Sequence, residues 1–113
     1  MKRIAEALDE LGFGRYDWYE NKDGTWYGIV EFWTDTAGQD IPTEIEFDGT
    51  AEGFVQRFSE AAENYCVDDE VELYVGMRGQ RGVPNTVMEI VADCQEAKDT
   101  LMKIANKLKE AVA

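Results

Sequence analysis

The chain has 113 residues, of which 44% are hydrophobic and 31% charged, values that are typical of a folded globular domain and not of a disordered chain. The formal net charge is −13, and there is no histidine, which excludes His-based catalytic triads and His-ligated zinc. Residues 1–72 hold 19 acidic and 5 basic side chains, whereas residues 73–113 hold 5 acidic and 6 basic ones. A surface with this acidity repels nucleic acid and anionic membranes and attracts a basic protein partner.

Cysteine usage and the distribution of apolar residues bear on where the protein works. Cys66 and Cys94 show no CxxC spacing in a chain long enough to bury a core without disulfides, so we expect reduced thiols in a cytoplasmic protein. No apolar run approaches the roughly 18 residues of a transmembrane helix. The first residues, MKRIAEALDELG, also lack the apolar segment of a signal peptide. We expect one domain over residues 1–113.

The N-terminal third predicts a helix followed by a β-hairpin. Apolar residues at helical spacing indicate a helix over Lys2–Leu11, which Gly12 ends. Strands over Arg15–Glu20 and Thr25–Thr34 follow, joined by Asn21–Gly24, whose Asn-Lys-Asp-Gly sequence is typical of a type I turn with a left-handed glycine.

The register of this hairpin assigns its two faces. Tyr19 is expected opposite Tyr27, and Trp18 opposite Gly28, where the indole covers backbone that glycine leaves bare. Alternation along the strands then puts one set of residues toward the core. The predicted core-facing residues are Tyr16, Trp18, Trp26, Val30 and Phe32.

A third strand and a second helix come next. Ile41–Asp48 alternates cleanly and indicates a strand, and Thr50 is the expected N-cap for a helix over Ala51–Tyr65. The predicted inward residues are Ile41, Thr43, Ile45 and Phe47 on the strand and Phe54, Phe58, Ala61 and Tyr65 on the helix.

The C-terminal part predicts a fourth strand and two helices. Alternation indicates a strand over Val71–Met77, with Val71, Leu73, Val75 and Met77 inward and Glu72 and Tyr74 outward. A short helix is expected over Thr86–Ala92 and a longer one over Cys94–Ala111. The two are separated because Asp93-Cys94-Gln95-Glu96 matches a capping box.

The predicted fold is therefore α+β, a two-layer sandwich of a four-stranded, mainly antiparallel sheet with helices on one face, in the order α-β-β-β-α-β-α(α). The first five elements share the order of a double-stranded-RNA-binding domain. That family carries a lysine cluster at the start of its second helix, whereas this chain has Thr50-Ala51-Glu52-Gly53 there. We therefore expect no direct binding of nucleic acid.

The outer face of the predicted sheet is the candidate binding site. Rows of acids with aromatic rings between them suit a basic partner, with the rings as anchors and the acids as a steering rim. The alternative is an ordinary solvated face on which aromatic residues pair across strands. The candidate partner-binding residues are Asp17, Tyr19, Tyr27, Glu31, Trp33, Glu44, Glu46, Asp48, Glu72 and Tyr74, with Ile29 among them.

The loop Gly76–Gly82 is the one glycine-rich basic segment. Its backbone amides with Arg78 and Arg81 suit a phosphate or carboxylate, but the spacing is neither GxGxxG nor that of a P-loop. The alternative is that both arginines pair with the protein's own surplus carboxylates.

No metal, cofactor or catalytic site is predicted. Asp68-Asp69-Glu70 and the pair Asp35 and Asp40 lack the ligand spacing of an EF-hand. Glu44 and Glu46 are a carboxylate pair, but outward positions on a solvated strand lack the burial that raises a carboxyl pKa. We expect a protein that is not an enzyme.

The segment Asp48–Pro84, which contains DGTAEGFVQRFSEAAENY and DDEVELYVGMRGQRGVP, is similar to small acidic proteins encoded on mobile elements of gut Firmicutes. The resemblance covers about a third of the chain and implies a genomic setting, with no functional residue to transfer.

These observations favour a non-catalytic acidic protein-binding domain, in one form a nucleic-acid mimic that inhibits a host DNA-binding or defence protein. The alternatives are an immunity protein or antitoxin that binds one basic toxin, and an interaction domain of no further assigned role. A homodimer is compatible with each of these hypotheses.

Overall fold

The computed structural model describes residues 2–12, 16–33, 41–79 and 81–112, without the side chains of Phe32, Trp33 and Pro42. It contains four helices and one three-stranded sheet within these ranges. The elements are α1 (Lys2–Glu10), β1 (Tyr16–Glu20), β2 (Trp26–Trp33), β3 (Pro42–Gly49), α2 (Ala51–Asn64), α3 (Val67–Tyr74) and α4 (Val87–Val112). The molecule is elongated, with extents of 48 × 23 × 22 Å.

The sheet is antiparallel in the order β1-β2-β3, and its register confirms the predicted hairpin. Tyr19 lies opposite Tyr27, and Trp18 lies opposite Gly28. The turn closes with the amide of Gly24 donating to the carbonyl of Asn21, and Gly24 has a φ of 86°, as the type I turn with a left-handed glycine requires.

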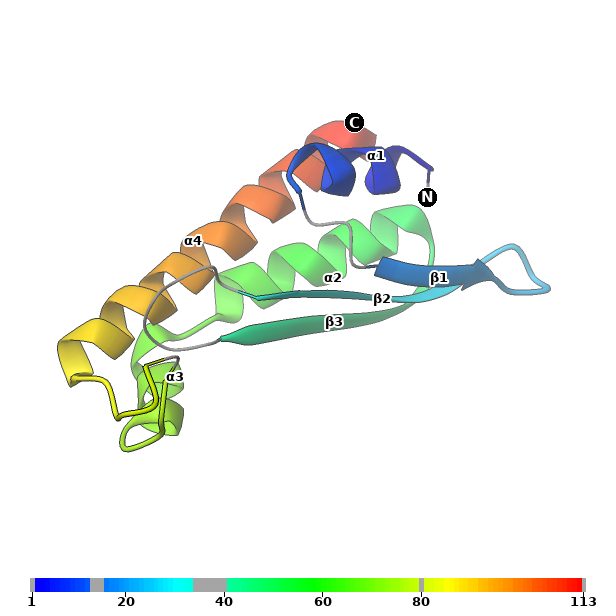
Figure 1. Cartoon of the computed structure of the whole chain (residues 1–113). Coiled ribbons are helices and arrows are strands. Elements are labelled where there is room, and N and C mark those ends of the chain that lie inside the picture. The colour runs from blue at the N-terminus through cyan, green and yellow to red at the C-terminus, as the bar shows by residue number, and fades with distance from the viewer. Residues whose placement is uncertain (1, 13–15, 34–40, 80, 113) are drawn as a thin grey trace.

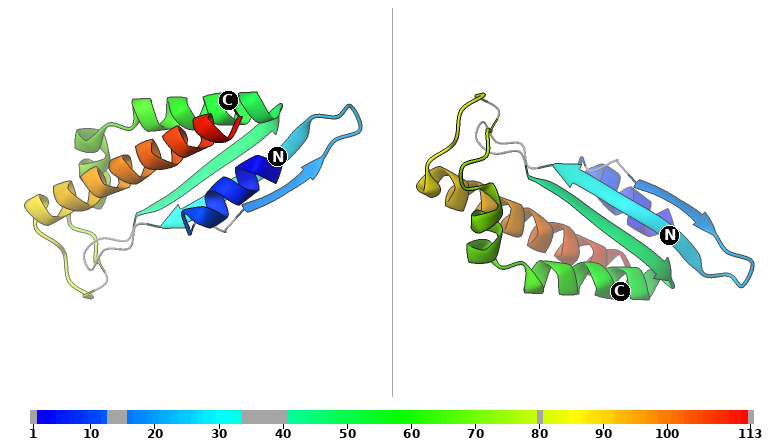
Figure 2. Two further views of the ribbon diagram at one scale, coloured as in Figure 1. Left: turned by 90° about the horizontal axis from the view of Figure 1, so that it is seen from above. Right: turned by 90° about the horizontal axis from the view of Figure 1, so that it is seen from below.

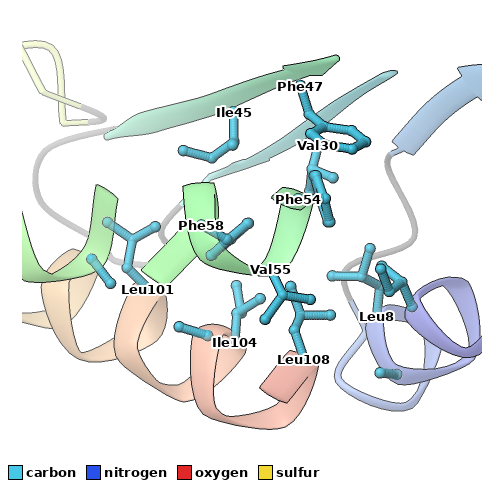
Figure 3. Packing of buried hydrophobic residues seen from close by; sticks show 14 residues of the cluster. Leu8, Val30, Ile45, Phe47, Phe54, Val55, Phe58, Leu101, Ile104 and Leu108 are labelled. Atoms are coloured by element: carbon cyan, nitrogen blue, oxygen red, sulfur yellow. The ribbon is translucent and has the colours of Figure 1, made fainter. Parts of the chain in front are cut away.

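The core lies between one face of the sheet and the helices. Figure 1 shows β2 and β3 on one side, α2 next to them and α4 beyond α2, while α1 covers the end of the sheet near the N-terminus. In Figure 3, Phe47 and Val30 of the sheet point toward Phe54 of α2, and Val55 points the other way, toward Leu108 of α4. The second helix therefore has two apolar faces, one for the sheet and one for the last helix.

The core face of the sheet agrees with its alternation pattern. Val30, Ile45 and Phe47 are buried, and three rings of β1 and β2 pack partly buried against them. Those rings belong to Tyr16, Trp18 and Trp26, and the first two stack with ring centroids 4.3 Å apart.

The predicted fourth strand over Val71–Met77 is wrong, because this segment forms the helix α3 and the residues just after it. Val67, Val71 and Tyr74 recur at helical spacing and pack against α4, and three acids in the first turn favour the helix dipole. Leu73, Val75 and Met77, which were expected inward, are 63%, 54% and 51% exposed.

The predicted break between two C-terminal helices is also wrong, because α4 runs without interruption from Val87 to Val112. Its N-terminal capping box lies at Thr86 and Glu89: the Thr86 hydroxyl accepts from the Glu89 amide at 3.2 Å, and the Glu89 carboxylate accepts from the Thr86 amide at 3.1 Å. Asp93, which was expected to cap the longer helix, is buried inside α4. The apolar stripe continues through that point from Ile90 to Leu108.

A lysine joins the end of α2 to the middle of α4. The Lys98 ammonium group donates to the carbonyl oxygens of Tyr65 at 2.5 Å and Ala62 at 3.5 Å. These carbonyls lie at the C-terminal end of α2, where the helix dipole favours a cation.

Candidate functional site

The open face of the sheet holds most of the predicted site residues. We define the acidic sheet face by its eight described outward positions, which lie in cross-strand rows because the register aligns them. Asp17, Ile29 and Glu46 form one row, Tyr19, Tyr27 and Asp48 form the next, and Glu31 lies opposite Glu44.

Nothing in the described part of the chain covers this face. Figure 2 (right) shows the strands in front, with α1 and α4 behind them. Asp17, Glu44, Glu46 and Asp48 are exposed, and Tyr19 is 60% exposed. The other three residues, Tyr27, Ile29 and Glu31, are half-buried among their neighbours. None of the eight positions carries a basic side chain, so the face presents five carboxylates with no internal counter-charge.

Two tyrosines are held in place at the hairpin end of the face. The Tyr27 hydroxyl donates to Glu46 at 2.6 Å, and the Tyr19 ring lies 5.4 Å from the Tyr27 ring. The hydrogen bond to Glu46 and the charge of that carboxylate raise the pKa of Tyr27 above its ordinary value. At neutral pH this phenol keeps its proton and donates it to Glu46, and its ring contacts the Tyr19 ring of the same chain.

A neighbouring side chain orders the edge of the same face. The Asn21 amide donates to Asp48 at 3.2 Å and to the Thr25 hydroxyl at 3.0 Å. Asp23, in the same turn, accepts from the Thr25 hydroxyl and amide, which lowers the pKa of Asp23. The turn therefore holds the Asp48 carboxylate of the face through Asn21, and it adds a further carboxylate, that of Asp23, at the hairpin end.

The spacing of the carboxylates follows from strand geometry. Successive outward residues on one strand lie about 7 Å apart, and adjacent strands lie about 4.8 Å apart. The five carboxylates lie along strand segments roughly 14 Å long, which is about one charge per 3 Å of strand length. The corresponding axial spacing per charge is ~3.4 Å in one strand of nucleic acid and ~1.7 Å in a duplex.

Three predicted site residues do not belong to the described face. Glu72 and Tyr74 lie on α3, away from the sheet, because the predicted fourth strand is a helix. Tyr74 is half-buried against α4, and burial raises its pKa. The backbone of Trp33 pairs with Pro42 at the end of β2, but its side chain lies outside the described residues.

A hollow beside the face extends the site onto α2, and the sequence patterns did not single out its residues. It has a volume of about 420 Å³ and lies between β3 and the polar side of α2. Gln56 and Glu60 face it at a spacing of four residues and are joined by a 3.0 Å hydrogen bond. The sequence did contain a signal for these two residues: they are four positions apart on the polar side of a predicted helix that directly follows the third strand. Its lining comprises Glu46, Phe47, Asp48, Gly53, Gln56, Arg57 and Glu60.

The glycine-rich loop holds its two arginines differently. Arg81 pairs with Glu89 and donates to Asn85 at 2.7 Å, so this arginine is bound within the chain. The guanidinium group of Arg78 makes no hydrogen bond or ion pair with another described residue. Among the described residues, the pairing of both arginines with the protein's own carboxylates is therefore confirmed for Arg81 and is not seen for Arg78.

The remaining predicted clusters are also placed. Asp68, Asp69 and Glu70 form the first turn of α3, whereas Asp35 and Asp40 lie outside the described residues. No group of three or more Cys, Asp or Glu side chains in the described ranges is arranged to hold a metal ion. No helix in those ranges combines the length and the apolar character needed to cross a membrane.

The acidic sheet face thus brings five carboxylates and the Tyr19–Tyr27 pair together, and the hollow beside it adds Gln56, Arg57 and Glu60 of α2. Comparison of the chain with protein families, with curated proteins and with solved structures finds no match.

Proposed function

We propose that the protein is a non-catalytic binding domain that uses the acidic sheet face to hold a basic surface of another protein. The observation that carries this proposal is an uncovered face of eight described positions with five carboxylates, two ordered tyrosines and no basic residue.

The two kinds of side chain contribute differently. An exposed ion pair is worth about 0–1 kcal/mol, so the carboxylates alone give little affinity. They raise the association rate and exclude acidic competitors. Tyr19 and Tyr27 supply the apolar area and the hydroxyl groups from which binding hot spots are commonly built.

The specific form that we favour is a nucleic-acid mimic that blocks a DNA-binding or defence protein. Its support is the charge density of the face, close to that of nucleic acid, on a sheet that keeps the carboxylates at regular intervals. A protein site built for phosphates would accept such rows in place of its ligand.

The second candidate is an immunity protein or antitoxin for one basic toxin. The observation that favours it is the Tyr19–Tyr27 pair at one end of the face, with Tyr27 fixed by Glu46. A purely electrostatic mimic does not require ordered rings, whereas recognition of a single partner benefits from them.

The test is a pull-down from the source cell at low and high ionic strength, with mass spectrometry of the retained proteins. Basic proteins retained at low salt and lost at high salt are the expected result. Retention only of neutral or acidic proteins, insensitive to salt, would contradict the proposal.

A pair of triple variants separates this face from net charge alone. Glu31→Gln, Glu44→Gln and Glu46→Gln together remove three charges from the acidic sheet face. Glu63→Gln, Glu96→Gln and Glu110→Gln remove three from exposed helix positions and serve as the matched control. We expect the first variant to weaken binding of the retained partner roughly tenfold or more, and the control to weaken it far less. Equal losses would assign binding to overall charge.

Competition with duplex DNA discriminates between the two candidates. A nucleic-acid mimic should displace duplex DNA from its partner. An antitoxin should inhibit its toxin equally well in the presence and in the absence of duplex DNA. A toxin gene beside this one favours the antitoxin, and a cluster of defence inhibitors favours the mimic.

A further inference from the structure

A second surface, at the other end of the molecule from the β1–β2 hairpin, is apolar instead of acidic. Seven large apolar side chains within 19 residues are 40% to 84% exposed, and Met88 is the most exposed of them. We define the apolar end by these residues: Leu73, Val75, Met77, Val83, Val87, Met88 and Val91.

These residues come from elements that meet at one end of the fold. Figure 1 shows α3, the connection after it and the first turns of α4 together at the end away from the hairpin. On α4, Val87, Met88 and Val91 lie within about a third of the helix circumference, directly beside the buried stripe of Ile90 and Cys94. They extend the apolar side of α4 beyond the part that the rest of the described chain covers.

The amount of exposed apolar surface is large for a domain of this size. The largest apolar patch on a typical monomer covers about 300–600 Å² and often serves a binding function. Six of the seven large apolar side chains at this end are more than half exposed, and one partner's share of a standard interface is about 800 Å².

The charge of the apolar end distinguishes it from the rest of the molecule. Residues 73–91 contain Arg78, Arg81 and Glu89, a net charge of +1 in a chain of net charge −13. Two copies that approach through the acidic sheet face bring five carboxylates against five. At the apolar end apolar side chains meet instead, and the remaining repulsion comes from the acids of α3 at the rim and from the net charge of each chain. These features favour a second copy of this chain as the occupant of the apolar end.

The rim of the apolar end also carries both signs of charge. Arg78 has no side-chain partner in the described part of its own chain, and the first turn of α3 presents Asp68 and Asp69 as exposed carboxylates. A two-fold axis places the same patch on both sides of an interface, so a self-complementary patch needs an apolar centre with acids and bases around it.

We propose that two copies of the chain form a two-fold dimer through the apolar end, with Met88 and Leu73 at its centre and Arg78 facing acids of the other copy. The two hairpins then point away from each other. If the acidic sheet face binds as proposed above, the dimer presents two such faces at its distal ends.

Sedimentation velocity or light scattering over a range of tens of micromolar tests this proposal. The wild-type chain is expected to show a concentration-dependent dimer. Met88→Glu and Leu73→Glu should each raise the dimer dissociation constant roughly a hundredfold or more, because each dimer loses two apolar contacts and gains two charges. Asn106→Glu adds the same charge at an exposed position of α4 outside the patch and should leave the dimer intact.

Salt and a binding control make the outcomes distinct. Dimerisation should strengthen with added salt, which screens repulsion between the two acidic chains, whereas binding of a lysine decamer to the sheet face should weaken. The Met88→Glu monomer should still bind the decamer with unchanged affinity per chain. A wild-type chain that stays monomeric, or a dimer that survives both substitutions, would overturn this inference and leave the proposed function unaffected.

Discussion

Gly28 is the residue at which the sheet has least room. A Cβ atom there would lie 2.4 Å from the Trp18 Cβ and 3.0 Å from the Asp17 carbonyl oxygen, both on β1. These atoms belong to a paired strand and cannot move as the end of a flexible side chain does.

We therefore expect Gly28→Ala to lower the free energy of unfolding by about 1–3 kcal/mol, the cost of overpacking. Urea denaturation followed by tryptophan fluorescence measures the change. Ile29→Val, on the same strand but on the half-open face, is the control and should cost less. An unchanged urea midpoint for Gly28→Ala would contradict this prediction, because it would mean that β1 can move away from β2 at this point without loss of stability.

Tyr27 provides a titration that reports on the acidic sheet face. Its raised pKa means that the folded chain keeps the phenol proton to a higher pH than the unfolded chain does. This contribution to stability is present below the ordinary tyrosine pKa of about 10 and is lost as the pH rises through the raised value.

Glu46→Gln should bring the pKa of Tyr27 down toward its ordinary value, because it removes the carboxylate that accepts the hydroxyl proton at 2.6 Å. NMR of ring-labelled tyrosine across alkaline pH measures the pKa of Tyr27 in the wild-type chain and in the variant. Glu63→Gln, a distant exposed glutamate, is the control. The same titration in both variants would show that Glu46 does not hold this phenol.

At the scale of single elements, the sequence of α4 contains two candidate capping boxes, of which only the first caps the helix. Both Thr86-Val87-Met88-Glu89 and Asp93-Cys94-Gln95-Glu96 fit a capping box. The first forms both reciprocal hydrogen bonds, and Glu89 also pairs with Arg81. Bonds from the Thr86 amide and hydroxyl, with the charge of Arg81, lower the pKa of Glu89.

Thr86→Ala should therefore destabilise the protein by about 1 kcal/mol, the usual effect of losing an N-cap side chain. Thermal unfolding by circular dichroism checks it. Thr100→Ala, the same substitution inside α4, is the control and should be neutral or slightly stabilising, because alanine is the better helix former. If the two variants melt together, the cap at Thr86 contributes nothing.

The element α3 illustrates a different competition. Val71-Glu72-Leu73-Tyr74-Val75 alternates as a strand does, but Val67, Val71 and Tyr74 also recur as on a helix. Packing decides between the two periods: Val71 is buried against Ile90 and Cys94 of α4.

On the scale of the whole molecule, charge and apolar surface lie in different places. The acidic sheet face is open on the side away from α4, and the apolar end lies where α3 meets the start of α4. If both proposals hold, salt should weaken the attraction of a basic partner to the first surface and reduce the repulsion between two chains at the second, so opposite salt responses would report on each surface separately.

The sequence by itself determined the α-β-β-β-α order of the first five elements, the hairpin register and the acidic rows of the three strands. These features depend on local signals: alternation, a four-residue turn, a glycine opposite a tryptophan, and an N-cap at Thr50 whose hydroxyl accepts from the Gly53 amide at 3.0 Å. Such signals act between residues that are close in the chain or paired by a short turn, so they can be read without the fold.

Only the tertiary structure decided that residues 71–77 do not form a strand and that α4 is one uninterrupted helix. Whether residues 71–77 join the sheet depends on contacts with α4, from which they are separated by a loop, and not on their own alternation. That packing moved Glu72 and Tyr74 off the candidate site and left the apolar end exposed, whereas the packing of α2 beside β3 placed Gln56 and Glu60 next to the site. Long-range burial made these choices, because a segment with two compatible periodicities takes the one that buries more of its apolar surface against the rest of the chain.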